Sequence, residues 1–318
     1  MNKVLYIILI SLFSFTIISC AKKSSDDSSS TNDDTSTTTS TDFIAVGRSG
    51  TILTSSDNGT TWTSRATGIS NGLYKITYEN DTFVTVGNSG NILTSSDDGI
   101  TWTSRTGTSN SLYKVIYGNS IFITVGNTGT ILTSSDGTTW TSRTSGTSTD
   151  HYRIAYGNSN FVTVGKAGTI FTSSDGVTWT SRTSGTSNGL FAITYANSTF
   201  IAVGDNDEGA GTILTSPDGI TWTSRTSGTT EGLLGVTYGN SIFVISGGAG
   251  TILTSTDGTS WTARTTATSN NLLRVTYGNG LFVTVGKEGT ILTSSDGISW
   301  TSRTSGTSNR LYGVTYSE

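Results

Sequence analysis

The feature that most constrains this chain is a short sequence that returns seven times. Its first copy reads SSDNGTTW at residues 55–62, and each later copy keeps an aspartate, a glycine and a closing tryptophan. The chain has seven tryptophans, and each one closes a copy: Trp62, Trp102, Trp140, Trp179, Trp222, Trp261 and Trp300. Successive tryptophans are 38 to 43 residues apart. Self-similarity at this period predicts a repeat architecture.

Each copy has the composition of a tight turn between two strands. Asp-Gly between runs of Thr, Ile and Leu favours a hairpin, because Gly adopts a positive φ and Asp accepts hydrogen bonds from turn amides. The pattern S-x-D-x-G-x-x-W resembles the Asp-box, also called the bacterial neuraminidase repeat; two copies match it in full and five are one residue shorter. We interpret the repeated aspartates as turn-formers rather than catalysts: Asp57, Asp97, Asp136, Asp175, Asp218, Asp257 and Asp296.

Aligned copies predict a unit of four strands, at residues 73–78, 83–87, 91–95 and 101–106 in the second copy. Four antiparallel strands repeated around an axis describe an all-β propeller. The first unit lacks its first strand, and residues 311–316 (LYGVTY) supply a spare one. A closed ring needs such a division because it satisfies both sheet edges at once. We therefore predict a seven-bladed β-propeller over residues 43–318, closed by three N-terminal strands and one C-terminal strand, and acting as a monomeric ring.

Composition excludes several kinds of site. Cys20 is the only cysteine and His151 the only histidine, so one chain cannot form a disulfide, a His pair, a His–Cys dyad or a cysteine-rich metal cluster. We predict no cofactor and no metal, and we interpret His151 as an ordinary loop residue. The formal net charge of −4 shows no basic excess, so we also predict no nucleic-acid partner.

The N-terminus has the pattern of an export signal. Lys3 precedes 15 mostly apolar residues, a run that is short for a membrane span and typical of a signal peptide. Residues 17–20 (IISC) resemble a bacterial lipobox, which implies cleavage before Cys20 and lipidation of that residue. An ordinary signal or a short anchor helix is the alternative. We predict a lipoprotein signal at 1–19, a lipidated and disordered Ser/Thr/Asp tether at 20–42, and a location at the cell envelope, on the outer membrane or cell surface.

Positions that differ between copies are the candidates for binding, because a functional residue has to differ from its structural copies. The third position of the first strand includes Lys75, Lys114, Arg153 and Arg274, and the loop after the second strand includes Arg48, Lys166 and Lys287. With Arg310, these predict a basic face that attracts an acidic polymer, a carboxylated sugar or an acidic partner segment; solvated charge that keeps the ring soluble is the other reading. An arginine also recurs in every fourth strand, where we expect it to bridge blades or cover tryptophan.

The whole pattern resembles seven-bladed Asp-box propellers related to photosystem II assembly factors. That resemblance implies turns of the SSDG type on one face and ligand-binding loops on the other. We predict a non-catalytic binding or scaffold propeller for an acidic protein or glycan, anchored to the membrane through lipid. The alternative is a glycan-active hydrolase similar to sialidases, in which Lys114, Arg153 and Arg274 mimic part of an arginine cluster. Its carboxylates would come from Glu79, Asp81, Asp150, Glu231 and Glu288.

Overall fold

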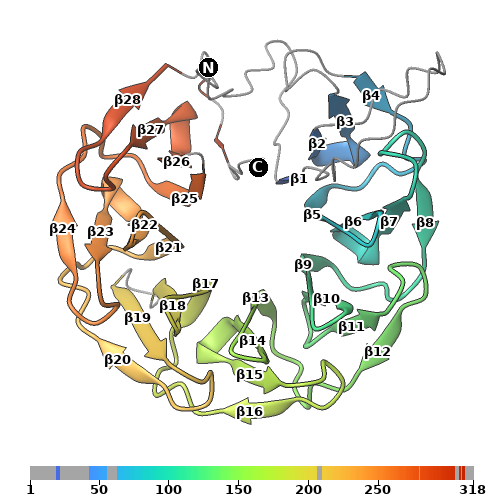
Figure 1. The fold of residues 1–318 in the computed structure, drawn as a ribbon, viewed down its shortest axis with the longest axis horizontal. Coiled ribbons are helices and arrows are strands. Elements are labelled where there is room, and N and C mark those ends of the chain that lie inside the picture. The colour runs from blue at the N-terminus through green and yellow to red at the C-terminus, as the bar shows by residue number, and fades with distance from the viewer. Residues whose placement is uncertain are drawn as a thin grey trace, which may run out of the picture.

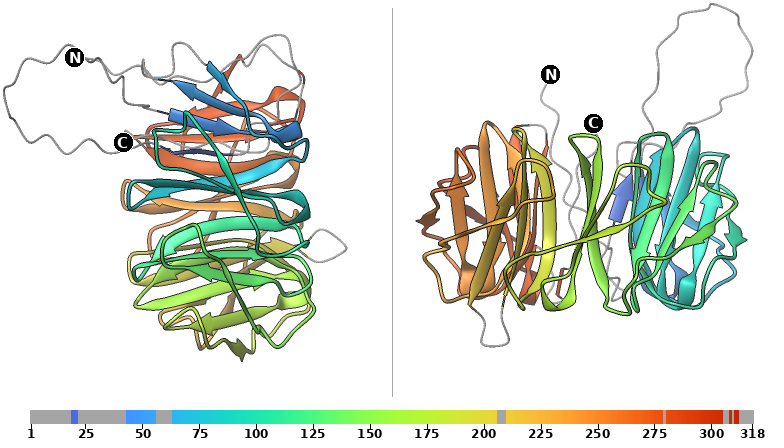
Figure 2. Two further views of the ribbon diagram at one scale, coloured as in Figure 1. Left: turned by 90° about the vertical axis from the view of Figure 1, so that its right-hand side faces the viewer. Right: turned by 90° about the horizontal axis from the view of Figure 1, so that it is seen from below.

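The computed structural model describes residues 19–21, 43–55, 63–205, 210–278, 280–304, 308, 310 and 311. In these ranges the chain forms seven four-stranded antiparallel sheets, arranged as blades around a central channel (Figure 1). The side views show that the strands run along the depth of the ring (Figure 2). The predicted seven-bladed β-propeller is confirmed.

Each blade runs from an inner strand at the channel to an outer strand at the circumference. The inner strands are β1 (Ser19–Ala21), β5 (Leu73–Glu79), β9 (Leu112–Gly118), β13 (His151–Gly157), β17 (Gly189–Ala196), β21 (Leu233–Gly239) and β25 (Leu272–Gly278). The second strands are β2 (Phe43–Val46), β6 (Thr82–Gly87), β10 (Ile121–Gly126), β14 (Asn160–Gly165), β18 (Thr199–Asp205), β22 (Ile242–Gly247) and β26 (Leu281–Gly286).

The third strands are β3 (Ile52–Ser55), β7 (Ile92–Ser95), β11 (Ile131–Ser134), β15 (Ile170–Ser173), β19 (Gly211–Ser216), β23 (Ile252–Ser255) and β27 (Ile291–Ser294). The outer strands are β4 (Thr63–Arg65), β8 (Thr103–Arg105), β12 (Thr141–Arg143), β16 (Thr180–Arg182), β20 (Thr223–Arg225), β24 (Thr262–Arg264) and β28 (Thr301–Arg303). Short 3-10 turns join second and third strands: η1 (Arg48–Gly50), η2 (Asn88–Gly90), η3 (Lys166–Gly168), η4 (Gly248–Gly250) and η5 (Lys287–Gly289).

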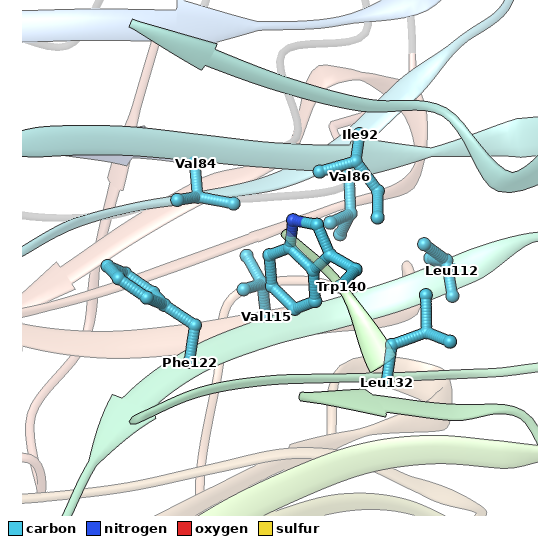
Figure 3. Packing of buried hydrophobic residues seen from close by; sticks show 8 residues of the cluster. All are labelled: Val84, Val86, Ile92, Leu112, Val115, Phe122, Leu132 and Trp140. Atoms are coloured by element: carbon cyan, nitrogen blue, oxygen red, sulfur yellow. The ribbon is translucent and has the colours of Figure 1, made fainter. Parts of the chain in front are cut away.

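The hydrophobic core lies between blades rather than at the centre of the ring. Figure 3 shows one such layer, where Val84 and Val86 of one blade face Phe122, Leu132 and Trp140 of the next. The second strands are buried on both faces, and β6 has five consecutive buried residues after Thr82. This is why apolar residues stand at consecutive positions, as Phe83 and Val84 do, instead of alternating with polar ones.

The repeated Asp-Gly turns are held by the hydrogen bonds that their sequence predicts. In the turn between β11 and β12, Asp136 Oδ1 accepts from the amides of Thr138 and Thr139, each at 2.8 Å. The indole of Trp140 donates to Gly137 O at 2.8 Å. The six described aspartates of the set all accept backbone amides in this way. Asp57 and Trp62 lie outside the described residues.

The recurring outer-strand arginines make side-chain hydrogen bonds within their own blade. All seven donate Nε to a threonine hydroxyl on the adjacent third strand, at 2.8 to 2.9 Å, as Arg105 does to Thr94. They therefore tie the short outer strand to its own sheet. These hydrogen bonds do not bridge blades, which was one of the two expected roles; the other, that the arginines cover tryptophan, stays a prediction.

Closure of the first blade differs from the prediction in its described part. The inner strand of that sheet is β1, in which Cys20 pairs with Ala45, so residues 20 and 21 are strand rather than tether. The rest of the predicted signal and tether lies outside the described residues. Leu311 lies where the predicted closing strand should begin. Its amide donates to Gly286 O at 2.9 Å, and the amide of Leu73, at the start of β5, makes the equivalent bond to Gly47 O at 2.8 Å. The remainder of that strand, residues 312–316, is also outside the described residues, so its pairing stays a prediction.

Candidate functional site

The two ends of the channel are chemically different. Because each inner strand begins beside the end of its second strand, as Leu73 does beside Gly87, the η turns and the loops that enter the inner strands share one face. We call this the η face. The Asp-Gly turns lie on the opposite face, where Asn119 of one blade donates to Ser174 O of the next at 3.2 Å. The strand register therefore puts the Asp-Gly turns and the η turns on opposite faces, as the resemblance implied.

A β-bulge shapes the η-face mouth of the channel. In β5 the pairing with β6 skips Tyr74, so Leu73 and Lys75 pair while Tyr74 is the extra residue. The same shift occurs in β9, β13, β17, β21 and β25. A bulge re-aims the side chain that it inserts. The residues at this inserted position are Tyr74, Tyr113, Tyr152, Phe191, Leu234 and Leu273.

Four of these residues form an aromatic arc that the sequence interpretation did not identify. Ring centroids of Tyr74 and Tyr113 are 6.1 Å apart, those of Tyr113 and Tyr152 are 6.1 Å apart, and those of Tyr152 and Phe191 are 5.7 Å apart. Burial raises the pKa of the three tyrosines, so their hydroxyls stay protonated at neutral pH. The signal was present in the sequence as an aromatic residue before each of three basic residues in the inner strands.

The predicted inner-strand cations converge on one cavity of about 890 Å³ in the channel. Lys75, Lys114, Arg153 and Arg274 all line it, and Arg48 lines its mouth. Lys166, Lys287 and Arg310 are not among the lining residues, so the structure divides the eight predicted basic residues into five that meet and three that do not. Of the residues that the structure describes, none that lines the cavity is acidic.

Burial and mutual repulsion perturb these cations. Burial first, and then the charges of Lys75, Arg153 and Arg274, hold the pKa of Lys114 well below its usual range. Burial lowers the pKa of Arg274 to about 10, and burial together with Arg274 lowers that of Arg153. Arginine side chains stay protonated in proteins, so both guanidinium groups carry a positive charge. The charges of the four groups therefore repel one another across the channel.

Backbone carbonyls hold the two arginines in place. Arg153 Nη1 donates to Tyr152 O at 2.7 Å. Arg274 Nη1 donates to Leu273 O at 2.6 Å and to Leu234 O of the neighbouring blade at 2.8 Å. These carbonyls belong to bulge residues, so the bulge that displaces Tyr152 and Leu273 also orients the cation that follows each of them. Arg274 thus combines a structural bridge with a place in the cavity.

The carboxylates that a hydrolase would need are dispersed. Glu79 and Asp81 lie at the turn between β5 and β6, on the Asp-Gly-turn face. Asp150, Glu231 and Glu288 lie at the η face, and none of the five lines the cavity. The described residues also contain no group of three His, Cys, Asp or Glu side chains that could hold a metal ion.

His151 is a core residue, and our interpretation of it as a loop residue is wrong. It opens β13 in the place where most other inner strands have leucine, its side chain is 0% exposed, and its ring meets Phe171 edge-on at 5.5 Å. Within the described part of the chain, neither ring nitrogen has a hydrogen-bond partner. Burial lowers its pKa to about 4, and the nearby Asp150 opposes that shift.

Comparison with known proteins supports the fold and leaves the family open. No protein-family profile and no curated protein matches the sequence. Among solved structures, YCF48 bound to a D1 peptide superposes with a TM-score of 0.64 at 19% identity, covering 88% of this chain and 93% of that chain. YCF48 from Cyanidioschyzon merolae gives a TM-score of 0.64 at 17% identity, covering 90% and 97%. The computationally designed Ika8 protein gives 0.74 at 12% identity, covering 97% and 93%. At these identities the likeness concerns the propeller alone.

Proposed function

We propose that this chain is an exported, lipid-anchored, non-catalytic scaffold that binds an acidic segment of a partner protein at its η face. The observation that carries the proposal is the cavity, where five cations meet and none of the described lining residues is acidic. A surface of one charge sign speeds and orients the encounter with a partner of the other sign. The peptide in the YCF48 structure is consistent with such a role for a propeller of this shape. An acidic glycan is the alternative ligand.

Two further assignments belong to this proposal. The Asp-Gly turns act as Asp-boxes whose role is structural, which agrees with an Asp136 carboxylate that accepts two turn amides. The lipid anchor is assigned to Cys20 because residues 17–20 resemble a lipobox. The assignment requires that Cys20 leave strand β1 after cleavage, and the predicted strand at 311–316 would then take its place in the first blade. In the described part of the chain, no helix has the length and apolar character needed to cross a membrane. Metabolic labelling with a palmitate analogue, compared between wild type and Cys20→Ser, tests the anchor, and equal labelling of the two proteins refutes it.

The partner is tested by crosslinked capture from intact cells followed by mass spectrometry. Lys75→Met with Lys114→Met removes two cavity charges while leaving the interblade bridge of Arg274 in place. Lys166→Met with Lys287→Met is the matched control, since it removes the same charge from the same face outside the cavity. We expect the first pair to lose the partner and the control to keep it, with melting temperatures of both close to wild type. Equal capture by the two double variants contradicts the proposal.

The glycan hydrolase remains the weaker candidate, because Asp/Glu-based glycoside hydrolysis needs two carboxylates that flank one bond. The five candidate carboxylates are spread over both faces and do not line the cavity. Hydrolysis of a fluorogenic sialoside or glycan panel by the purified protein would overturn the non-catalytic assignment.

A further inference from the structure

Charge on the η face is concentrated inside the channel rather than spread over the rim. Outside the cavity, the described rim carries three of the predicted cations, Lys166, Lys287 and Arg310, which alternate with acidic residues. The described acids of that face are Asp150, Asp205, Glu231 and Glu288. Rim charges therefore nearly cancel, whereas the charges of the described cavity residues add. The positive charge of this face is therefore concentrated in the cavity.

Two blades contribute small uncharged residues to the cavity wall. At the position that holds Lys75, Lys114 and Arg153 in three consecutive blades, the next two blades have Ala192 and Gly235. Both line the cavity, and neither places an opposing charge in it. The cavity volume of about 890 Å³ falls within the range of small-molecule sites. The sequence departures thus place cations from four blades around one cavity.

The half-buried cavity cations lie close enough to repel one another. The charges of Lys75, Arg153 and Arg274 act on Lys114, and the charge of Arg274 acts on Arg153. Backbone carbonyls hold Nη1 of Arg153 and of Arg274, so both guanidinium groups are oriented before a ligand binds. A bound anion would relieve the repulsion, and one with several charges and several acceptor oxygens would relieve it most.

We infer that this cavity is a binding site for a compact multivalent phosphate, such as a pyrophosphate or a phosphate ester with a second charge. Phosphate oxygens accept from several directions, which suits cations that come from four different blades. A single carboxylate side chain carries one charge and reaches one side of the channel. The inference goes beyond the proposed scaffold function, since it needs no protein partner.

Inorganic pyrophosphate is the probe for the full-length protein purified in detergent. Isothermal titration at constant ionic strength should show saturable binding of one pyrophosphate per chain, with a melting temperature that rises with ligand concentration. Lys114→Met should weaken binding at least tenfold, and Lys166→Met should not change it. Glycerol 3-phosphate is the second ligand to be titrated, because a lipid headgroup can supply the same phosphate. If pyrophosphate binds more tightly than glycerol 3-phosphate, the site is assigned to a soluble anion. Equal binding by both variants, or no saturation, overturns the inference.

Covalent trapping gives a readout that does not depend on the stability of a variant. With pyridoxal phosphate, a lysine amine attacks the aldehyde carbon, water leaves, and borohydride reduces the resulting imine to a secondary amine. Peptide mapping should place the label on Lys114 or Lys75 rather than on Lys166, and excess pyrophosphate should suppress it. Labelling by pyridoxal, which lacks the phosphate, should be weaker. Labelling spread over the surface lysines contradicts the inference.

The two proposals can fail separately. If partner capture fails while pyrophosphate binding is intact, only the proposed scaffold function is refuted.

Discussion

Replacement of the buried histidine gives a prediction with a calculable pH dependence. In the unfolded chain His151 has its ordinary pKa of 6.5, and in the folded protein burial lowers that pKa to about 4. The unfolded state therefore binds the proton more tightly. Stability from this residue is complete above pH 6.5 and is lost progressively as the pH falls towards 4. A difference of about 2.5 pKa units at 1.36 kcal/mol each is a loss of about 3 kcal/mol.

The perturbation is His151→Leu, which installs the residue that the same position has in β5 and β9. At pH 7.5 we expect the variant to be more stable than wild type by about 1–3 kcal/mol, because two buried ring nitrogens without partners are removed. Between pH 7.5 and pH 4 the advantage should grow by about 3 kcal/mol. Urea unfolding at several pH values measures the difference.

Because His151 is the only histidine, the assay has an internal check. A single imidazole titrates in the NMR spectrum of the wild type, and its midpoint in the folded protein should lie near 4. Parallel pH slopes for wild type and variant, or an imidazole that titrates near 6.5 while the protein is folded, would refute the reasoning. The first result would mean that the residue is not buried in its neutral form.

Three other perturbations follow from particular contacts. Gly235→Ala places a Cβ 3.1 Å from Val275 N and 3.2 Å from Arg274 Cα, so it should lower the free energy of unfolding by about 1–3 kcal/mol in urea titrations. Asp136→Ala removes the acceptor of two turn amides, and we expect a loss of about 1–2 kcal/mol by the same measurement. Lys114, whose pKa is lowered, should react with an amine-specific reagent at pH 8 before Lys166 does, as timed peptide mapping would show.

The architecture could be predicted because the same local signals recur in every unit. Seven Asp-Gly turns, seven apolar second strands and seven closing tryptophans each predict the same blade, and tight turns leave few ways to connect four strands. The predicted strand at 73–78 differs from β5 by one residue at its end. Repetition also located the basic third position, whose members do meet in the cavity.

What the sequence did not reveal depends on register and on single residues. The bulge at Tyr74 is a shift of one residue in pairing, and periodicity does not distinguish an inserted residue from a paired one. His151 was misread because a polar residue before a strand usually lies in a loop, whereas here the strand begins one residue earlier than expected. The partner of each outer-strand arginine could not be predicted, because the threonine that it meets is itself a repeated residue, and repeated residues carry no information about which copy they contact.

Repetition and function therefore occupy different positions of the same unit. The turns and second strands resemble one another closely because each must pack against the next blade. The inner strand borders the channel on its free edge, so those of its side chains that line the channel can differ between copies. The bulge residue at its second position is aromatic in four blades. Its third position contributes four cations to the cavity, from blades that are not all neighbours. A ring turns small differences between copies into one site, because every inner strand borders the same space.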